Sequence, residues 1–301
     1  MVLYYNTLKE TNGELAQLGE RLPYKQRVRG SSPLLSTIFF TSKLERAFFY
    51  LLRCSMEIFL TSSPCVEDPL HELPCILSEE GAFASKFKEA IQPNGAVMII
   101  AGDPYNDGLN DEMSDTFYKC FKRLGLSFSG CRLIDHRQPY LSKEDITQCS
   151  LIMLAGGHVP TQNQFFHEIG LKALLQDYQG VILGVSAGSM NAATYVYSQP
   201  ECPGEALDPH YPRWMEGLGL CNINILPHYN DFKGGTLDGM KIYEEIVARD
   251  SLGHCFYILK DGSYVHIKDG IYTLYSEIFE MKNGEMKLVC EMNASHQLES
   301  V

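Results

Sequence analysis

Hydrophobic positions between residues 56 and 186 fall into short unbroken apolar runs separated by longer amphipathic segments. The apolar runs predict buried strands at residues 56–63, 96–103, 130–136, 150–157 and 180–186. The segments between them carry apolar residues at helical spacing and predict helices at residues 83–92, 111–125 and 162–178. Continuous apolar strands that alternate with helices are typical of a mostly parallel sheet with helices on both faces. The sequence therefore predicts an α/β fold.

The pattern changes after residue 258, where apolar and polar residues alternate in short segments as far as residue 292. Three dipeptides that favour tight turns separate these segments: Asp261-Gly262, Asp269-Gly270 and Asn283-Gly284. Such dipeptides between alternating segments are the strongest short-range signal for a β-hairpin. We therefore expect C-terminal antiparallel hairpins that are appended to the parallel sheet and form no separate domain.

The composition excludes several classes of function. The 301 residues carry a formal net charge of −12, whereas surfaces that bind nucleic acid or anionic membranes need clustered Lys and Arg. The most apolar stretch, residues 34–52, is interrupted by Lys43, Glu45 and Arg46, so no membrane-spanning segment is expected. The ten cysteines lack the spacing of a zinc site, and no glycine-rich nucleotide-binding motif occurs. We expect a cytoplasmic protein with reduced cysteines and with no metal or organic cofactor.

The first 55 residues differ from the rest of the chain in charge and pattern. They hold eight Lys and Arg against four Asp and Glu, a net charge of +4, whereas residues 56–301 carry −16. Residues 13–34 show no hydrophobic period and look like a translated transfer-RNA gene. We expect residues 1–55 to be a non-native or disordered extension, Met56 to be the natural first residue, and residues 56–301 to form a single α/β domain.

A serine between two glycines stands where the last predicted strand of the parallel sheet ends. Residues 184–188 read GVSAG, which is a G-x-S-x-G turn. In hydrolases such a turn holds the serine at a tight corner between a strand and a helix and exposes its Oγ. The helix N-terminus favours developing negative charge, and the amide of Ala187 would be one oxyanion donor. Ser186 is therefore the candidate nucleophile.

A nucleophilic serine needs a base, and a histidine at a nearby strand end would supply it. His228 follows an apolar run and is the preferred candidate, while His158, in the loop after residues 150–157, is the rival. A carboxylate should orient the imidazole. Spacing alone does not choose among the four acids in or near the loop that separates Ser186 from His228: Glu201, Glu205, Asp208 and Glu216.

The segments GVSAGS, AGG and ILPHY together resemble the dipeptidase E (aspartyl dipeptidase) family of serine peptidases, which is related to cyanophycinase. The resemblance covers the chain from about residue 56 to the C-terminal hairpins and implies the class I glutamine amidotransferase-like fold. It implies Ser186 as nucleophile, His228 as base and Glu201, fifteen residues after the serine, as the acid. It also implies that the loop of Gly156 and Gly157 supplies the second oxyanion amide.

Two stretches depart from the family pattern. The family's G-G-N-T loop reads GGHV at residues 156–159, which places the imidazole of His158 beside the expected substrate site. Residues 234–242 lack the arginine that Asp-specific members carry, and Lys241 would replace a bidentate guanidinium by a point charge. The sequence therefore argues against specificity for Asp-X dipeptides.

Together these features predict a serine peptidase that hydrolyses dipeptides or short peptides through a Ser-His-Glu/Asp triad and an acyl-enzyme. The expected partner is a small peptide substrate, with no nucleic acid or membrane, and both a monomer and a homodimer remain open. A non-peptide amidase or esterase is one alternative, and a catalytically inactive binding or regulatory relative is another. A glutamine amidotransferase would carry a cysteine in place of Ser186.

Overall fold

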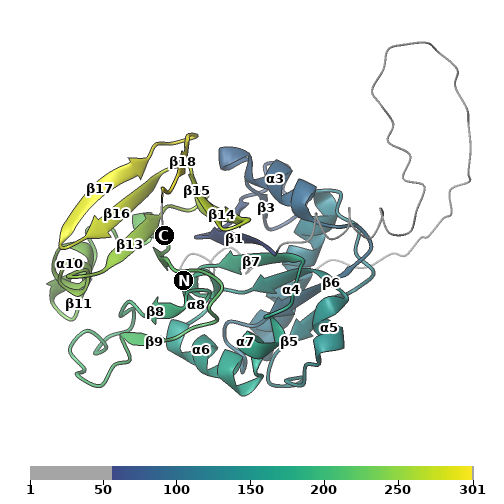
Figure 1. The fold of residues 1–301 in the computed structure, drawn as a ribbon, viewed down its shortest axis with the longest axis horizontal. Helices are drawn as coiled ribbons and strands as arrows, with labels where there is room; N and C mark the ends of the chain where they lie inside the picture. Colours follow the sequence, from purple (N-terminus) through teal and green to yellow (C-terminus); the bar gives the residue numbers. More distant parts are fainter. Residues whose placement is uncertain (1–55, 300–301) are drawn as a thin grey trace, which may run out of the picture. The chain divides into compact units, whose positions relative to one another are not determined.

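An eight-stranded sheet forms the centre of residues 56–299, the part of the chain that the computed structural model describes (Figure 1). The expectation for residues 1–55 lies outside the described residues. Five neighbouring strands are parallel, in the order β5 (Cys131–Ile134), β4 (Ala96–Ile100), β6 (Cys149–Leu154), β7 (Val181–Val185) and β1 (Glu57–Thr61). Beyond β1 the sheet continues with three antiparallel strands: β14 (Tyr264–Lys268), β15 (Ile271–Tyr275) and β18 (Ser295–Gln297). The predicted α/β fold with a mostly parallel sheet is confirmed.

Apolar packing on both faces of this sheet explains the unbroken apolar runs in the sequence. Successive side chains of a strand point to opposite faces. In β1, Ile58 and Leu60 belong to one apolar cluster, whereas Phe59 belongs to the other. In β4, Met98 belongs to the cluster of Ile58, and Val97 belongs to the cluster of Phe59. Both faces of these strands are buried, so consecutive positions along them are apolar.

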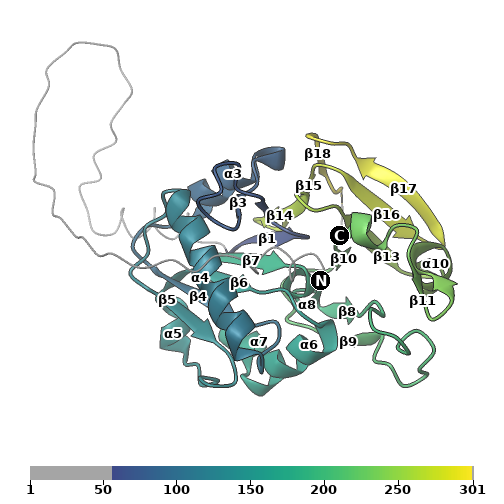
Figure 2. The ribbon, with the colours of Figure 1, turned by 180° about the vertical axis from the view of Figure 1, so that it is seen from behind.

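Helices cover both faces of the sheet, as the views from the two sides show (Figures 1 and 2). The face that carries Phe59 packs against α3 (Phe83–Ala90) and α4 (Asp107–Arg123). The face that carries Ile58 packs against α5 (Lys143–Thr147), α6 (Val159–Glu168), α7 (Leu171–Leu174) and α8 (Ala187–Asn191). None of the helices within residues 56–299 is long enough and apolar enough to cross a membrane.

Two helices differ from their predicted bounds for local reasons. Helix α4 begins four residues earlier than predicted, because the side chain of Asn106 accepts a hydrogen bond from the amide of Leu109 and caps the helix there. The single helix predicted at residues 162–178 is divided into α6 and α7. Gly170 stands between them with a φ of 64°, a left-handed conformation that ends the first helix.

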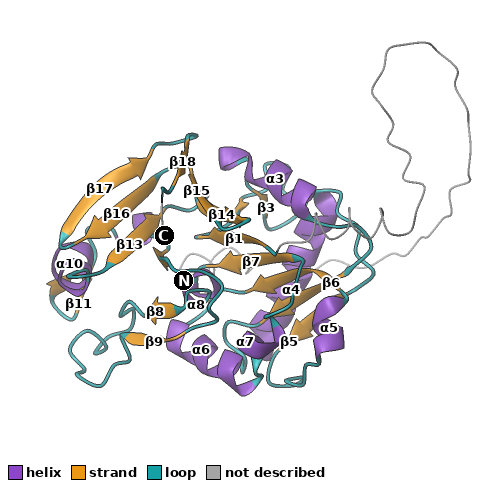
Figure 3. Cartoon of the chain, viewed as in Figure 1, coloured by secondary structure: helices purple, strands orange, loops and turns teal. Residues whose placement is uncertain are grey.

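The antiparallel strands between residues 255 and 290 lie in or next to the segment where the sequence predicts hairpins, whereas β18 lies beyond it, and they divide between two sheets (Figure 3). The second sheet has four strands, in the order β10 (Asn224–Leu226), β13 (Cys255–Leu259), β16 (Ile278–Lys282) and β17 (Glu285–Cys290). Two of the predicted turns form hairpins with positive φ at both residues: Asp269-Gly270 and Asn283-Gly284. The turn at Asp261 instead joins β13 in the second sheet to β14 in the central sheet, and only Gly262 has positive φ there.

Several short elements lie outside these two sheets. Three two-stranded ribbons pair β2 (Cys65–Val66) with β3 (Ile76–Leu77), β8 (Tyr195–Tyr197) with β9 (Trp214–Glu216), and β11 (Thr236–Leu237) with β12 (Met240–Lys241). The short helical segments are η1 (Glu80–Ala82), α9 (Tyr229–Phe232), the π-helix η2 (Ile242–Val247) and α10 (Ala248–Asp250). The amides of Gly204 and Ala206 bind the carboxylate of Asp238, which ties the β8–β9 loop to the β11–β12 ribbon.

Helix α8 passes so close to β6 that only glycine fits at position 188. A Cβ on Gly188 would lie 2.1 Å from the backbone oxygen of Leu154. We expect Gly188→Ala to lower the free energy of unfolding by about 1–3 kcal/mol, because the backbones must separate. At Gly108, in the first turn of α4, a Cβ would meet no atom within 4 Å. As the matched control, Gly108→Ala should raise the free energy of unfolding by about 0.4–1 kcal/mol. Urea unfolding measures both, and equal stability of the two variants would contradict the close packing of α8.

Candidate active site

Ser186 lies at a sharp corner between β7 and α8. Its φ of 51° and ψ of −115° lie outside the regions that L residues favour. Its amide donates to the carbonyl oxygens of Thr61 at 3.1 Å and Ser62 at 3.0 Å, and its carbonyl accepts a hydrogen bond from the amide of Ser189 at 2.9 Å. These bonds hold the strained backbone in place. The corner has the geometry that the G-x-S-x-G sequence predicts, with the Ser186 side chain at the end of β7.

His228 follows β10 and brings its imidazole to this corner. Its Nε2 lies 2.9 Å from the Oγ of Ser186, and its side chain is 11% exposed. The φ of 58° and ψ of 41° at His228 are left-handed, which turns the chain sharply before α9. The two residues that the sequence proposes as nucleophile and base are therefore within hydrogen-bond reach of each other, although 42 positions separate them.

The acid that binds His228 is Asp261. The Oδ1 of Asp261 lies 2.9 Å from Nδ1 of the imidazole. Because an ionised carboxylate only accepts hydrogen bonds, Nδ1 carries the proton and Nε2 is free to accept the hydroxyl proton of Ser186. The structure does not place Glu201 in this position, contrary to the sequence expectation, since Asp261 and Ser186 already occupy both ring nitrogens.

Parallel pairing of β10 and β13 explains how Asp261 reaches His228. Leu226 pairs with Ile258 in this register, so the carboxyl ends of both strands lie at the same edge of the second sheet. His228 stands two residues after β10, and Asp261 stands two residues after β13. The sequence carries this signal as two apolar runs that each end in a polar residue. The Asp261-Gly262 dipeptide obscures it, because such a dipeptide by itself predicts only a hairpin turn.

Ser62 connects all three of these residues. Its hydroxyl donates to Oδ1 of Asp261 at 2.5 Å and accepts a hydrogen bond from the backbone amide of His228 at 2.8 Å. Its carbonyl oxygen accepts the amide of Ser186. The Ser62 residue is fully buried, at 0% exposure. No motif of the sequence marks Ser62, which immediately follows β1 at the centre of the sheet.

The pKa of the Asp261 carboxyl lies below its ordinary value. Partial burial raises this pKa, but the hydrogen bond from His228, the charge of that imidazole and the hydrogen bond from Ser62 outweigh the effect of burial. About half of the side chain, 47%, is exposed. Asp261 is therefore ionised at neutral pH and stabilises a positive charge on the neighbouring imidazole.

His158, the rival base, is engaged elsewhere. Its Nδ1 lies 2.9 Å from Oγ1 of Thr161, and its Nε2 lies 3.0 Å from Oε1 of Glu205. The other carboxylate oxygen of Glu205 accepts the amides of Glu201 at 2.8 Å and Cys202 at 2.9 Å. His158 and Glu205 therefore link the loop after β6 to the β8–β9 loop, and neither imidazole nitrogen is left to activate a serine.

Glu201 lies near the imidazoles without binding the ring of His228. Burial raises the pKa of its carboxyl, and the charges of His158 and His228 only partly offset that rise. The remaining acids that the sequence left open also have other partners. The carboxylate of Asp208 accepts the amide of His210 at 2.8 Å, and Glu216 forms an ion pair with Lys172 at 2.6 Å. Among these acids, Asp261 is the one whose carboxylate binds the ring of His228.

The glycine loop after β6 passes directly beside the serine. A Cβ on Gly156 would lie 3.3 Å from the Cβ of Ser186, and a Cβ on Gly157 would lie 2.5 Å from the carbonyl carbon of Gly102. A side chain at position 157 would force the two loops apart, so the close approach requires glycine. Ala187 begins α8, and its amide has no acceptor within the helix. The amides proposed as oxyanion donors thus belong to segments that flank Ser186.

Three groups of side chains within residues 56–299 bring possible metal-ligand atoms within 4.8 Å of one another. Two of them share residues with the site just described: His228 with Asp231 and Asp261, and His158 with Cys202 and Glu205. In both groups the histidine and a carboxylate already bind each other. The third group lies between β2, β3 and α4 and consists of Cys65, Cys75 and Cys120.

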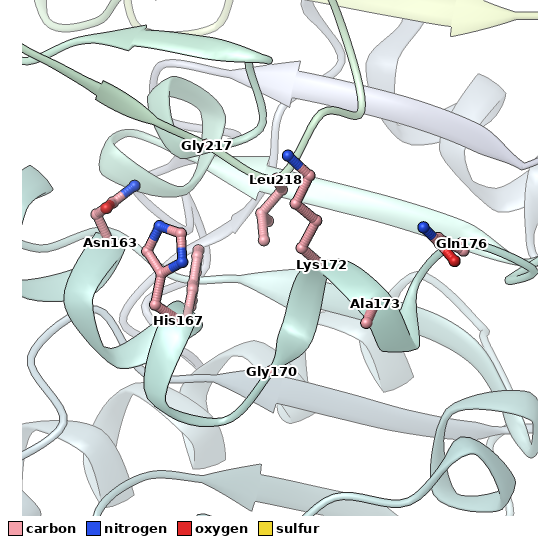
Figure 4. A pocket seen from close by; sticks show the side chains of 9 residues that line it. Asn163, His167, Gly170, Lys172, Ala173, Gln176, Gly217 and Leu218 are labelled. Atoms are coloured by element: carbon pink, nitrogen blue, oxygen red, sulfur yellow. The ribbon is translucent and has the colours of Figure 1, made fainter.

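A separate pocket of about 250 Å³ opens between α6, α7 and the segment that follows β9 (Figure 4). His167 and Lys172 border it, and both are tied to Glu216. Ser186, His228 and Asp261 are not among the residues that line this pocket. Its full lining is Asn163, Phe166, His167, Gly170, Lys172, Ala173, Gln176, Gly217 and Leu218.

Comparisons with known proteins give a family and a similar fold. Residues 104–275 match the model of Peptidase family S51. No curated protein sequence matches the chain. Among solved structures, a peptidase from an acI-B1 Actinobacterium is similar with a TM-score of 0.55 and 17% identity over 82% of this chain and 98% of that one, which supports the fold. A candidate peptidase E protein from Listeria monocytogenes EGD-e has a TM-score of 0.43 and 16% identity, over 78% and 98% of the two chains.

The family match spans more than half of the chain and includes Ser186, His228 and Asp261. It confirms the resemblance that the motifs of the sequence suggest. This protein therefore belongs to peptidase family S51 and is a peptidase.

Proposed function

We propose that the protein hydrolyses dipeptides or short peptides through a triad of Ser186, His228 and Asp261. The observation that carries this proposal is the continuous chain of two 2.9 Å hydrogen bonds from Oγ of Ser186 through the imidazole to Oδ1 of Asp261. A serine, a base and an orienting acid in this order form the arrangement that activates a hydroxyl for acyl transfer. The triad is thus Ser-His-Asp, with Asp261 in the role that the family resemblance implies for Glu201.

In the first half of the reaction, His228 removes the hydroxyl proton as Ser186 Oγ attacks the carbonyl carbon of the peptide bond. The imidazolium that forms is stabilised by the carboxylate of Asp261. It then gives its proton to the leaving amine, and the C–N bond breaks to leave an acyl-enzyme. Water, deprotonated by the same imidazole, attacks the ester carbon. The bond between the carbonyl carbon and Oγ then breaks, and the imidazolium returns its proton to Oγ, which releases the carboxylic acid and restores the hydroxyl of Ser186.

The tetrahedral oxyanion would be stabilised by the amides of Ala187 and Gly157. Ala187 directly follows the nucleophile, and Gly157 lies in the loop that packs against it. Amide donors held by rigid backbone require little reorganisation when charge develops, and one such donor is worth about 10²–10³ in kcat. The close packing of Gly157 on Gly102 supports this role, because it fixes the loop in place.

Charge around the triad favours a substrate with a positive group. Asp261, Glu201 and Glu205 all lie at or beside the site. The arginine of the β8–β9 loop, Arg213, is paired with Asp250 at 2.6 Å. The segment at residues 234–242 contributes the carboxylate of Asp238 to the loop contacts. A free N-terminal ammonium complements these carboxylates, whereas an aspartate side chain would be repelled.

The nucleophile assignment is tested with a fluorophosphonate probe and a panel of dipeptides. We expect the probe to label the wild type and not Ser186→Ala. Dipeptides with a neutral or basic first residue should be cleaved with a kcat/KM about tenfold or more above that of Asp-X dipeptides, because like charges are repelled. Amine release measures cleavage, with Ser186→Ala as the blank. Cleavage of esters or non-peptide amides alone would favour the amidase or esterase alternative, and a folded protein that is not labelled would favour an inactive relative.

The identity of the acid is tested by a matched pair of amide substitutions. Asp261→Asn should lower kcat by about 10⁴, because the amide can donate to Nδ1 and stabilise the wrong tautomer. Glu201→Gln should lower kcat by less than about tenfold, because its carboxylate does not bind the ring. Steady-state kinetics on one good dipeptide compares them, and circular dichroism checks that both variants fold. The reverse order of the two effects would return the acid role to Glu201.

The role of Ser62 is tested by the pKa of Asp261. Ser62→Ala removes a hydrogen bond that stabilises the ionised carboxylate, so the pKa of Asp261 should rise. The stability that ionised Asp261 contributes is present above its ordinary pKa and is lost as the pH falls through its lowered folded value. This loss should therefore begin at higher pH in Ser62→Ala. Titration of the ¹³C-labelled carboxyl by NMR measures the shift, and Ser62→Thr, which keeps the hydroxyl, is the control. An unchanged pKa would mean that Ser62 only fills space.

A further inference from the structure

Three cysteine side chains converge on the face of the sheet that α3 and α4 cover. Cys65 lies in β2, Cys75 directly precedes β3, and Cys120 lies in α4. All three Sγ atoms lie within 4.8 Å of one another, and those of Cys75 and Cys120 are 3.7 Å apart. From this juxtaposition we infer that the three thiolates form a binding site for a thiophilic metal ion, with Zn²⁺ as the ion that the site favours.

The distance between the sulfur atoms fits a common metal centre. Zinc binds thiolates at about 2.3 Å in tetrahedral geometry, which places two sulfur ligands about 3.8 Å apart. The 3.7 Å between Cys75 and Cys120 matches this spacing without any rearrangement. The nine described cysteines are all free thiols, and the cluster is the group of three among them that comes together.

The backbone around the cluster is fixed by hydrogen bonds. Cys65 pairs with Leu77 across the β2–β3 ribbon, which brings Cys75 near it. The intervening loop is organised by Asp68, which is 1% exposed and whose carboxylate accepts amides of the loop. Those amides belong to Leu70, Glu72 and Leu73 at 3.0–3.1 Å. The ligands are therefore held close together before any ion binds, which lowers the entropic cost of binding.

The surroundings of the cluster favour thiolate–metal bonds and leave a path for the ion. Cys120 is 2% exposed and packs in an apolar cluster with Phe117 and Phe121. Cys65 and Cys75 are half-buried, so an ion can enter from their side and a water molecule can complete the tetrahedron. Soft thiolate ligands select Zn²⁺ or Cu⁺ over Mg²⁺ or Ca²⁺. Three thiolates with Zn²⁺ carry a net charge of about −1, whereas with Cu⁺ they carry about −2. The apolar surroundings therefore favour Zn²⁺, because less net charge is buried.

The binding step balances as an exchange of protons for the metal. Each thiol that is protonated beforehand loses its proton to solvent when its sulfur binds the ion, and no electron is transferred. The sequence gives no warning of such a site, since the three cysteines are far from the C-x₂₋₄-C spacing of zinc motifs. Only the fold brings these cysteines together. The sequence expectation of no metal is based on the spacing of cysteines along the chain, and that spacing does not reveal this cluster.

The test is a Zn²⁺ titration of the reduced, chelator-treated full chain against a chromophoric competitor. We expect one tightly bound Zn²⁺ per chain, and an affinity loss on the order of 100-fold in Cys75→Ser and Cys120→Ser. Cys65→Ser, at a half-buried position, keeps the test valid if Cys120→Ser fails to fold. Cys221→Ser is the matched control, because Cys221 is buried outside the cluster, and it should bind as the wild type does. Cd²⁺ should add a sulfur-to-metal absorption band that the three cluster variants weaken.

Three results would overturn the inference. The first is a wild type that binds no Zn²⁺. The second is binding that survives every cluster substitution but is lost in His158→Ala, which would place the ion at His158, Cys202 and Glu205 instead. The third is a disulfide between Cys75 and Cys120 in protein whose free thiols were alkylated at lysis. Mass spectrometry would detect it as a gain of two hydrogens when the alkylated protein is treated with a reductant. That disulfide would mean that the pair is a redox couple.

Discussion

The candidate active site depends on the hydrogen bonds of one residue, Ser62. Its carbonyl holds the amide of Ser186, its hydroxyl holds the amide of His228, and the same hydroxyl donates to Asp261. The three side chains come from segments that are far apart in the sequence. A buried hydroxyl with one donor and two acceptor positions satisfies two of these groups at once, and an unmade bond there would cost free energy. The position of β1 between β7 and β14 is what brings Ser62 to this point.

The two residues whose side chains meet, Ser186 and His228, are among the described non-glycine residues with an unusual backbone conformation. Ser186 and His228 both have positive φ, although neither is glycine. Each such conformation costs on the order of 1–3 kcal/mol and persists only where the surrounding structure fixes it. Here the bonds from Ser186 to β1 and the close packing of Gly188 on Leu154 provide that constraint. Strain of this kind points two side chains toward each other in a way that regular elements could not.

The sequence predicts the parallel strands of the central sheet well, because strands buried on both faces leave an unmistakable apolar pattern, whereas the break of a helix at Gly170 is not foreseen. It also proposes Ser186 and His228, which follow β7 and β10 and lie within hydrogen-bond reach of each other. It could not identify Asp261, because the pairing of β10 with β13 is a long-range event and an Asp-Gly dipeptide is normally a turn. Nor could it identify Ser62, whose role follows only from what surrounds β1. The family resemblance favours Glu201, which is close to the imidazole but does not bind it.

The pairing partners of β1 also determine when the site can form. Ile58 pairs on one side with Ile182 and on the other with Ile267, more than 200 residues further along the chain. A nascent polypeptide contains β1 long before it contains β14, and contacts of such sequence separation form slowly. The sheet around β1 is therefore completed only after β14, at residues 264–268, has been synthesised.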